Sequence, residues 1–328
     1  MADRSGSSSG ARSDQFLANI ALLYYGEGLT QNEIANRVGV SRATIVNCLR
    51  EGRERGIVDI HINGRALAAS SLSRELRERF DLVDAYISYT DTKQKTAAAE
   101  TLRQTARVAA MALYDIVSPG CRLGVAWGVT TKAVADQLPR TGIPSVTVHQ
   151  MIGAMQTDRL PAAETCSIQV ASRLGATCHT LHAPAVLSSA DLAAKLREEP
   201  TIRTQMNRLQ TLDAALFSVG DCSPNTHLVA AGIAKESELG EAIAKGGAGI
   251  VCARFIDEAG AHLPLKLDQR IFAIDLATLR EVPVKLMVAA GPSKLNATLA
   301  ALRGKLVSHL VVDVALAKLL LAAQGPTR

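Results

Sequence analysis

The chain has 328 residues, of which 48% are hydrophobic, 3% aromatic and 20% charged, and its formal net charge is +5. This length exceeds that of a bare DNA-binding module and allows a small domain beside one of roughly 250 residues with a sizeable core. The few aromatic residues disfavour a stacking surface for single-stranded nucleic acid. No stretch is predicted to span a membrane, because the late apolar segment LVVDVALAKLLLAA is interrupted by Asp313 and Lys318.

The cysteines are scattered along the chain, with no pair at the spacing of metal ligands and no signal peptide ahead of them. This pattern is typical of reduced, mostly buried thiols in a soluble, cytoplasmic protein. We therefore expect no metal site and no cofactor. The six cysteines stand at positions 48, 121, 166, 178, 222 and 252.

The first segments of the chain differ sharply in composition. Residues 1–13 are rich in Ser and Gly and are predicted to form a disordered tail, because they cannot bury enough apolar surface to offset chain entropy. Residues 14–25 place apolar side chains at helical spacing, which predicts a helix that packs against the motif after it.

A helix-turn-helix motif is predicted between residues 29 and 57. Thr30 and Glu33 have the spacing of a capping box, so a short helix should begin at Thr30. Gly39 follows where the chain must turn sharply, since glycine enters the left-handed conformation at little steric cost. Ser41 can then cap a second helix, which Gly56 is expected to end. Helix, tight turn and helix in this order indicate the DNA-binding motif.

The outward side chains of this motif suit the major groove of double-stranded operator DNA. Arg can bond to guanine, Asn can pair with adenine, and a Thr or Ala methyl can touch the thymine methyl. The alternative is a solvated helix of an ordinary bundle, but the cap, the turn glycine and the packing residue Ile45 fall in register. The expected DNA contacts are Thr30, Gln31, Ser41, Arg42, Ala43, Thr44, Asn47 and Arg50.

The charge of the motif is modest. From Thr30 to Arg55 there are five Arg and three Glu, a local charge of +2. Nonspecific attraction to phosphates should therefore be limited in one subunit, and two or more copies acting together would raise the affinity through linked binding.

The boundary between the domains is predicted to follow the motif. Residues 57–62 alternate like a strand and could form a small wing. Residues 70–80 mix Arg and Glu at spacings of three and four, as expected of a solvated connecting helix. We therefore predict a DNA-binding domain over 14–65, a connecting helix over 66–82 and an effector domain over 83–328.

The larger domain alternates short apolar runs with helical stretches. This indicates an α/β fold with a mainly parallel, Rossmann-like sheet covered on both faces, in which ligands bind at the carboxyl ends of the strands. The expected strands are 83–88, 122–126, 145–151, 177–181, 214–219, 248–255, 284–289 and 309–312, with a long helix over 97–116.

The most informative strand end is LGVAWGVTT, residues 123–131, which precedes an expected helix over 132–138. Gly128, Thr130 and Thr131 there offer backbone donors, two hydroxyls and a positive helix end, which suit a phosphate or another anion. A simple tight turn is the alternative, and the sequence lacks the glycines of a Rossmann loop and the ending of a Walker loop.

Other strand ends carry further candidates. The ammonium of Lys294, in AAGPSKLN, could complete an anion site, although a solvated lysine is the alternative. Gln150 at a strand end and Glu164 at the next helix start could bond to sugar hydroxyls, though each alone is more often structural. For Asp221 and Thr226, in the loop GDCSPNTH, a ligand role and a structural role are equally open.

Taken together, the motifs resemble one family. The chain shows LTQNEIANRVGVSRATI, GIVDIHI, LGVAWGVTT, DAALFSVG, GAGIVCARFIDEAG and AAGPSKLNATLAALRG in the order found in the SorC family of bacterial sugar-binding transcriptional regulators. The resemblance spans nearly the whole chain after the tail. It implies an effector domain similar in fold to ribose-5-phosphate isomerase and glucosamine-6-phosphate deaminase. It also implies a sugar, polyol or sugar-phosphate effector that alters operator binding, commonly in a tetramer.

The resemblance also implies roles for particular residues. Gly128, Thr130 and Thr131 match the phosphate-type loop of the family, and Lys294 matches the lysine after its late glycine. Gln150 falls where the family contacts the sugar.

The chain departs from the family at Ile250, where an acidic residue is usual. A hydroxyl contact that relatives supply there is expected to be absent. The departure also disfavours the alternative of a sugar-phosphate isomerase or deaminase with an appended DNA-binding arm, because that chemistry needs a carboxylate and a base over the substrate.

The leading hypothesis is a transcriptional regulator of a carbohydrate or polyol catabolic operon, not an enzyme. We expect a homotetramer or a dimer that binds operator DNA less or more tightly when its effector is bound. A third possibility is a larger domain that serves only oligomerisation. Its polar strand ends argue against this, because burying Thr130, Thr131 and Lys294 without a partner would be costly.

Overall fold

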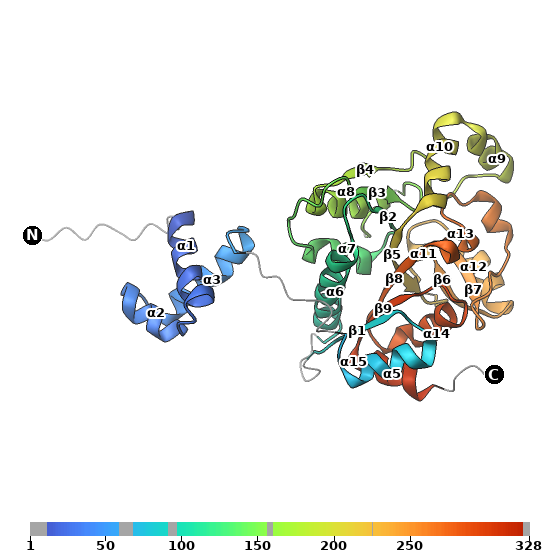
Figure 1. Ribbon diagram of the computed structural model, residues 1–328. Coiled ribbons are helices and arrows are strands. Elements are labelled where there is room, and N and C mark those ends of the chain that lie inside the picture. Colours follow the sequence, from blue (N-terminus) through green and yellow to red (C-terminus); the bar gives the residue numbers. More distant parts are fainter. Residues whose placement is uncertain (1–11, 59–67, 91–96, 156–159, 225, 324–328) are drawn as a thin grey trace, which may run out of the picture. The chain divides into compact units, whose positions relative to one another are not determined.

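The computed structural model describes residues 12–58, 68–90, 97–155, 160–224 and 226–323 (Figure 1). The chain divides into two compact units, Met1–His61 and Ile62–Arg328, which are described separately below. Most of the predicted tail and of the predicted wing lies outside the described residues. Two residues assigned to the tail have defined partners: Ser13 caps the first helix, and Arg12 pairs with Glu51 at 3.2 Å.

The described residues of the smaller unit form three α-helices, and the second and third have the predicted caps. The capping box is present, since the Thr30 N–H donates to Glu33 Oε2 at 2.7 Å and the Glu33 N–H donates to Thr30 Oγ1 at 3.3 Å. Gly39 turns the chain at φ 75°, and Ser41 Oγ accepts from the Thr44 N–H at 3.1 Å. The predicted helix-turn-helix is therefore confirmed. Its elements are α1 Asp14–Ala21, continued by the π-helical turn Leu22–Gly26, α2 Gln31–Val38 and α3 Arg42–Glu54.

These three helices share one small core. Each contributes apolar residues at helical spacing, so that one face of each helix is buried and the other stays in solvent. α1 packs against α3, and α2 packs against α3. The core consists of Leu17, Ile20, Ile34, Ala35, Ile45, Cys48 and Leu49.

The larger unit alternates helices and strands along the chain (Figure 1). Among its described residues, no helix is both long and apolar enough to cross a membrane. The elements are α5 Ser71–Phe80, β1 Asp84–Ser88, α6 Ala97–Ile116, β2 Arg122–Val125, α7 Val129–Gln137, β3 Thr147–Gln150, α8 Ala163–Leu174, β4 Thr177–His179, α9 Ala190–Glu198, α10 Pro200–Arg208, β5 Ala214–Gly220, α11 His227–Ala230, α12 Glu236–Ala244, β6 Gly247–Val251, β7 Arg254–Asp257, α13 Leu276–Glu281, β8 Val284–Ala289, α14 Leu295–Arg303, β9 His309–Asp313 and α15 Val314–Ala322.

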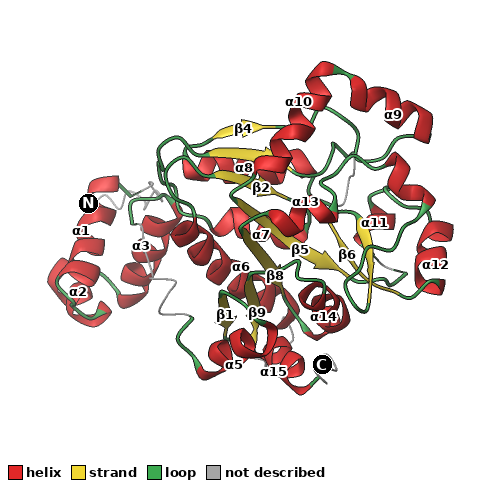
Figure 2. Cartoon of the chain, turned by 45° about the vertical axis from the view of Figure 1, so that its right-hand side comes forward, coloured by secondary structure: helices red, strands yellow, loops and turns green. Residues whose placement is uncertain are grey.

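The sheet confirms the predicted α/β class. Its strands pair in parallel in the order β1-β9-β8-β5-β2-β3-β4, and β6 and β7 extend it from the end of β5 as an antiparallel hairpin. Side chains of β5 alternate between two cores, with Ala214 and Leu216 in one and Phe217 and Val219 in the other. Helices α6, α7 and α8 supply the first core, and α5, α14 and α15 supply the second (Figure 2).

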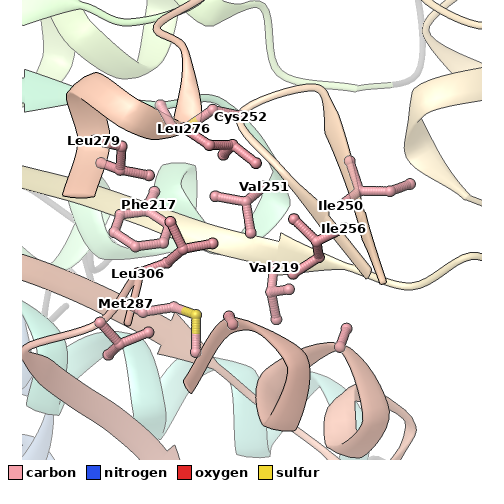
Figure 3. Packing of buried hydrophobic residues seen from close by; sticks show 14 of the residues in the cluster. Phe217, Val219, Ile250, Val251, Cys252, Ile256, Leu276, Leu279, Met287 and Leu306 are labelled. Atoms are coloured by element: carbon pink, nitrogen blue, oxygen red, sulfur yellow. The ribbon is translucent and has the colours of Figure 1, made fainter. Parts of the chain in front are cut away.

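The prediction of one strand over 248–255 is wrong. The chain reverses at Cys252 and Ala253, which have φ values of 48° and 65°, and returns as β7. A hairpin turn usually announces itself through Gly, Asn or Asp, and here both turn residues are buried and apolar or thiol-bearing. Because the apolar run continues through the turn, the sequence pattern does not indicate that the strand ends there. Figure 3 shows the neighbouring side chains Ile250 and Val251 on opposite sides of β6.

The description of residues 70–80 as a solvated connecting helix is also wrong. Helix α5 packs against β1 and α15, and its Leu76 and Phe80 lie in the main core of the larger unit. The Arg79 guanidinium donates to the carbonyl oxygen of Ala323, at the end of α15. The charged residues occupy only the outer face, so α5 is a structural part of the larger unit.

The β6–β7 hairpin is held against α14 by two glycines and one arginine. After β7 the chain turns at Gly260, whose φ is 76°, and lies directly against Gly304 at the end of α14. Arg280 donates to the carbonyl oxygens of both glycines, each at 3.0 Å. A Cβ at Gly260 would overlap with the backbone of Ala300 and Gly304, so this close approach requires glycine.

We expect Gly260→Ala to lower the free energy of unfolding by about 3 kcal/mol or more, because backbone atoms would have to move and φ is positive. Gly240→Ala is the matched control. Gly240 is exposed within α12, and an added Cβ there meets no atom within 4 Å. It should gain up to about 1 kcal/mol from helix propensity. Urea unfolding of both variants tests this, and equal stability would contradict it.

Candidate nucleic-acid interface and ligand cavity

The outer face of α3 is available to a partner. Arg42, Ala43, Asn47 and Arg50 are exposed, while Ile45 and its buried neighbours anchor the opposite face. The Arg50 guanidinium donates to Asn47 Oδ1 at 3.1 Å, and it lies 3.8 Å from the Glu54 carboxylate. These contacts are on the surface, where long side chains exchange partners at little cost. The guanidinium groups of Arg42 and Arg50 and the amide of Asn47 are therefore exposed on one helix face, where a partner can bond to them.

The remaining residues that were expected to contact DNA form hydrogen bonds within the helix-turn-helix. Thr30 and Ser41 cap α2 and α3 through their hydroxyls, and Thr44 is half-buried beside Ser41, with their hydroxyl oxygens 2.9 Å apart. Gln31 Oε1 accepts from Arg42 Nε at 3.2 Å, which links the start of α2 to the start of α3. The hydroxyl contacts thus stabilise the helix starts, and the Gln31–Arg42 bond links them.

A cavity of about 620 Å³ lies at the carboxyl ends of β2, β5, β8 and β9. Because parallel strands end at one edge of a sheet, residues far apart in the sequence meet there. Cavities of this size suit small-molecule ligands. Of the candidates, the cavity brings together Gly128, Thr130, Asp221, Thr226 and Lys294.

The loop at Gly128 opens directly onto this cavity. Gly128 has φ 127° and forms the N-cap of α7, which begins at Val129 rather than at residue 132. No atom lies within 4 Å of a Cβ added to Gly128. Thr130 lines the cavity, but Thr131 does not: it is buried in the first turn of α7, and its Oγ1 has no hydrogen-bond partner among the described residues. Thr131, which was predicted to contact the ligand, is therefore a buried residue outside the cavity lining.

The buried carboxylate of Asp313, which the sequence did not indicate as a functional group, fixes the loop that carries Lys294. Asp313 Oδ2 accepts from the Gly291 N–H at 2.6 Å, and its Oδ1 accepts from the N–H groups of Ala315 and Leu316 at 3.0 and 3.1 Å. It thus caps α15 and fixes the turn that leads to Lys294. An Asp between an apolar run and a helical run is a recognisable N-cap signal.

Lys294 and Asp221 form an ion pair inside the cavity, with Nζ 2.9 Å from Oδ1. Partial burial raises the pKa of Asp221, but hydrogen bonds with Ser223 and Lys294 and the charge of Lys294 outweigh it and leave the pKa lowered. The pKa of His227, which also lines the cavity, is lowered by burial and by Lys294. The pair thus presents a charged carboxylate and ammonium near a neutral imidazole.

Most of the remaining lining residues are apolar. They include Trp127, the single tryptophan of the chain. Ile250, at the position where an acidic residue is expected from the family resemblance, lines the cavity with only 6% of its surface exposed. Burial raises the pKa of the Cys252 thiol to about 12, so this cysteine stays neutral. The apolar lining also includes Ala126, Ile152, Val219 and Leu228.

Two expected ligand contacts lie apart from the cavity. Gln150 is 2% exposed, and its amide is used by the backbone: Nε2 donates to Ile152 O at 2.7 Å, and Oε1 accepts from the Leu181 N–H at 3.1 Å. Glu164 is not part of the lining, and its Oε2 is buried without a hydrogen-bond partner among the described residues. Gln150 is the last residue of β3, but its amide is bonded to the backbone of Ile152 and Leu181, so its position at a strand end does not make it a lining residue.

His149, beside Gln150, stacks on His179 with ring centroids 4.9 Å apart. Burial, followed by the charges of His179 and Arg208, lowers the pKa of His149 to about 4. In the described part of the chain, no group of three or more His, Cys, Asp or Glu residues is arranged to hold a metal ion.

Comparison with known proteins gives consistent matches over both units. The family model described as "Putative sugar-binding domain" matches residues 65–322. The chain is 33% identical to the uncharacterized transcriptional regulator YjhU of Escherichia coli (strain K12) over 328 residues, 99% of each chain. It is 26% identical to the sorbitol operon regulator of Klebsiella pneumoniae over 310 residues, 94% of this chain and 98% of that protein. The crystal structure of the full-length sorbitol operon regulator SorC from Klebsiella pneumoniae is similar with a TM-score of 0.69 and 27% identity, covering 94% of this chain and 99% of that chain.

We expect His149→Gln to flatten the dependence of stability on pH. The folded pKa of about 4 lies below the ordinary value of 6.5, so the contribution of neutral His149 is complete above pH 6.5. It falls as the pH drops from 6.5 towards 4, by up to about 1.4 kcal/mol per pH unit. Urea unfolding at pH 8, 6.5, 5.5 and 4.5 measures this, with pH 8 as the reference. Parallel curves for the two proteins would contradict it.

Proposed function

Because the chain belongs to the SorC family of sugar-binding transcriptional regulators, we propose that it regulates a carbohydrate or polyol catabolic operon. A sugar, polyol or sugar phosphate in the cavity changes its affinity for operator DNA. The observation that carries the proposal is a cavity of about 620 Å³ at the strand ends, in a chain that also exposes the reading face of a helix-turn-helix. Its relatives and structural neighbours are transcriptional regulators, not enzymes.

Operator recognition rests on α3. Arg42 and Arg50 can bond to the O6 and N7 of guanine, and Asn47 can bond to adenine, from one exposed helix face. Thr30 and Ser41 cap the starts of α2 and α3, and Gln31 bonds to Arg42 between them. The exposed positions of Thr30 and Ser41 near the helix starts also suit contacts with phosphates.

Effector recognition rests on the polar part of the cavity. Lys294 can bond to an anionic or hydroxyl group, the amides at Gly128 and the Thr130 hydroxyl can bond to another, and Asp221 can accept from a sugar hydroxyl. The apolar face of a sugar ring can pack on Trp127. This arrangement holds a small polyhydroxylated ligand from several strand ends at once.

The effector must bind two arrangements of the protein unequally, since equal affinity would shift nothing. The structure offers a route for this difference. Asp313, Val314 and Ala315 line the cavity at the start of α15, and α15 packs against α5. Helix α5 is the first helix along the chain among the described residues of the larger unit. A ligand that moves the start of α15 therefore acts on the helix through which the chain enters this unit.

We also propose a cytoplasmic homotetramer, with a dimer as the smaller alternative. The local charge of +2 on the reading motif favours linked binding by several copies. Val83 and Tyr89, at either end of the edge strand β1, are each 63% exposed and offer apolar surface for a second copy. Sedimentation equilibrium of the full chain measures the assembly.

Lys294→Ala and Arg42→Ala should separate the two activities. Lys294→Ala is expected to weaken effector binding more than about ten-fold and to leave operator affinity without effector unchanged. Arg42→Ala should weaken operator binding by about ten-fold or more and leave effector binding unchanged. Trp127 fluorescence during titration with sugars, polyols and sugar phosphates measures effector binding. Gel shifts on duplexes selected from a random pool measure operator binding. The proposal fails if no ligand changes either signal.

Arg79→Ala should reduce the coupling between the two activities, because it removes the bond between α5 and the end of α15. We expect each affinity alone to stay within about two-fold and the effector-induced change in operator affinity to shrink. Arg303→Ala is the matched control, since Arg303 also donates to a backbone carbonyl, that of Glu258, at 3.1 Å. An unchanged effector response in Arg79→Ala would exclude this route.

A further inference from the structure

Val46 is an exposed apolar residue on the face of α3 that carries the reading side chains. Its surface is 43% exposed, whereas Ile45, Cys48 and Leu49 of the same helix are buried. Arg42 lies one turn before Val46 and Arg50 one turn after it, so the three residues form a stripe along the helix. The stripe alternates charge, apolar surface and charge.

Neither folding nor the core explains a valine here. The three-helix core is complete without Val46. Valine is a poorer helix former than alanine by roughly 0.5 kcal/mol, because its branched Cβ restricts χ1. The same restriction fixes the positions of its two methyl groups, which favours a defined apolar contact over a solvated surface.

The charges around Val46 indicate the chemistry of its partner. Arg42 and Arg50 flank it. Arg50 lies 3.8 Å from the Glu54 carboxylate, and the carboxylate of Glu51 is turned to Arg12 and Arg55, at 3.2 and 3.0 Å. The two flanking guanidinium groups suit a partner that offers hydrogen-bond acceptors at the flanks and an apolar group between them. In the major groove of DNA, O6 and N7 of guanine are such acceptors, and the C5-methyl of thymine is the apolar group that base edges present.

We propose that Val46 reads a thymine methyl in the operator, a specificity contact that rests on the proposed DNA binding. Four residues of helix span about 6 Å, and successive base pairs are about 3.4 Å apart. The thymine therefore lies within about two base pairs of the base that Arg42 contacts. Uracil in its place loses only the methyl and keeps every hydrogen-bonding group of the edge.

The test replaces each thymine of a selected operator duplex by deoxyuracil, one position at a time. Duplexes are first selected from a random pool by the full-length chain, and Arg42→Ala locates the base that Arg42 contacts. The wild type should lose about four-fold in affinity at one thymine of each half-site, as expected for one buried methyl. Val46→Ala should bind the thymine and uracil duplexes equally at that position and keep the wild-type response elsewhere.

Two controls keep the result specific. Val46→Ile retains branched methyls and should retain the response to uracil. Leu192→Ala removes another apolar side chain of similar exposure, 45%, on α9 of the larger unit, and should reproduce the wild-type profile. A Val46→Ala profile identical to that of the wild type, with operator affinity intact, would overturn the inference and leave the proposed function standing. Failure to select any sequence would count against the proposed function itself and against this contact with it.

Discussion

The parallel pairing of β9, β8, β5 and β2 is the constraint on which the larger unit depends. It brings four strand ends to one edge, where backbone N–H groups of turns and helix starts need acceptors. Asp313 meets three of these donors, from Gly291, Ala315 and Leu316. One buried carboxylate thereby joins two neighbouring loops and leaves the cavity beside them open. The β6–β7 hairpin closes the far side, held to α14 by the contact of Gly260 with Gly304.

The cavity combines two kinds of surface. Its charged pair, Lys294 and Asp221, comes from loops that follow β8 and β5, and each charge satisfies the other before any ligand enters. A ligand must therefore compete with this pair or bridge it, which favours a molecule that offers both an acceptor and a donor. The apolar part of the lining, with Trp127, Ile250 and Cys252, offers few polar partners. A hydroxyl pressed against it would lose its water without replacement, which costs about 1–3 kcal/mol.

In the smaller unit, some polar side chains stabilise the helix-turn-helix and others are free to contact another molecule. Thr30 and Ser41 cap the starts of α2 and α3, and Gln31 bonds to Arg42 between the two helices, which pack together through their shared apolar core. Asn47 and Arg50 make only surface contacts and can turn towards another molecule. Because the capped helices pack on one shared core, the exposed side chains of α3 are held in a defined arrangement even though the unit is small.

The sequence alone determined the helix-turn-helix, the α/β class and most strand positions, because caps, turn glycines and periodicity act over a few residues. It also placed Gly128, Thr130, Asp221, Thr226 and Lys294 at strand ends, and the structure brings these together. Tertiary packing alone decided the rest. The Gln150 amide bonds to the backbone of Ile152 and Leu181, Thr131 turns inward on α7, residues 248–255 fold back as a hairpin, and α5 buries one face. Strand order, side-chain direction and long-range contact depend on neighbours distant in the chain, and no local pattern encodes those neighbours.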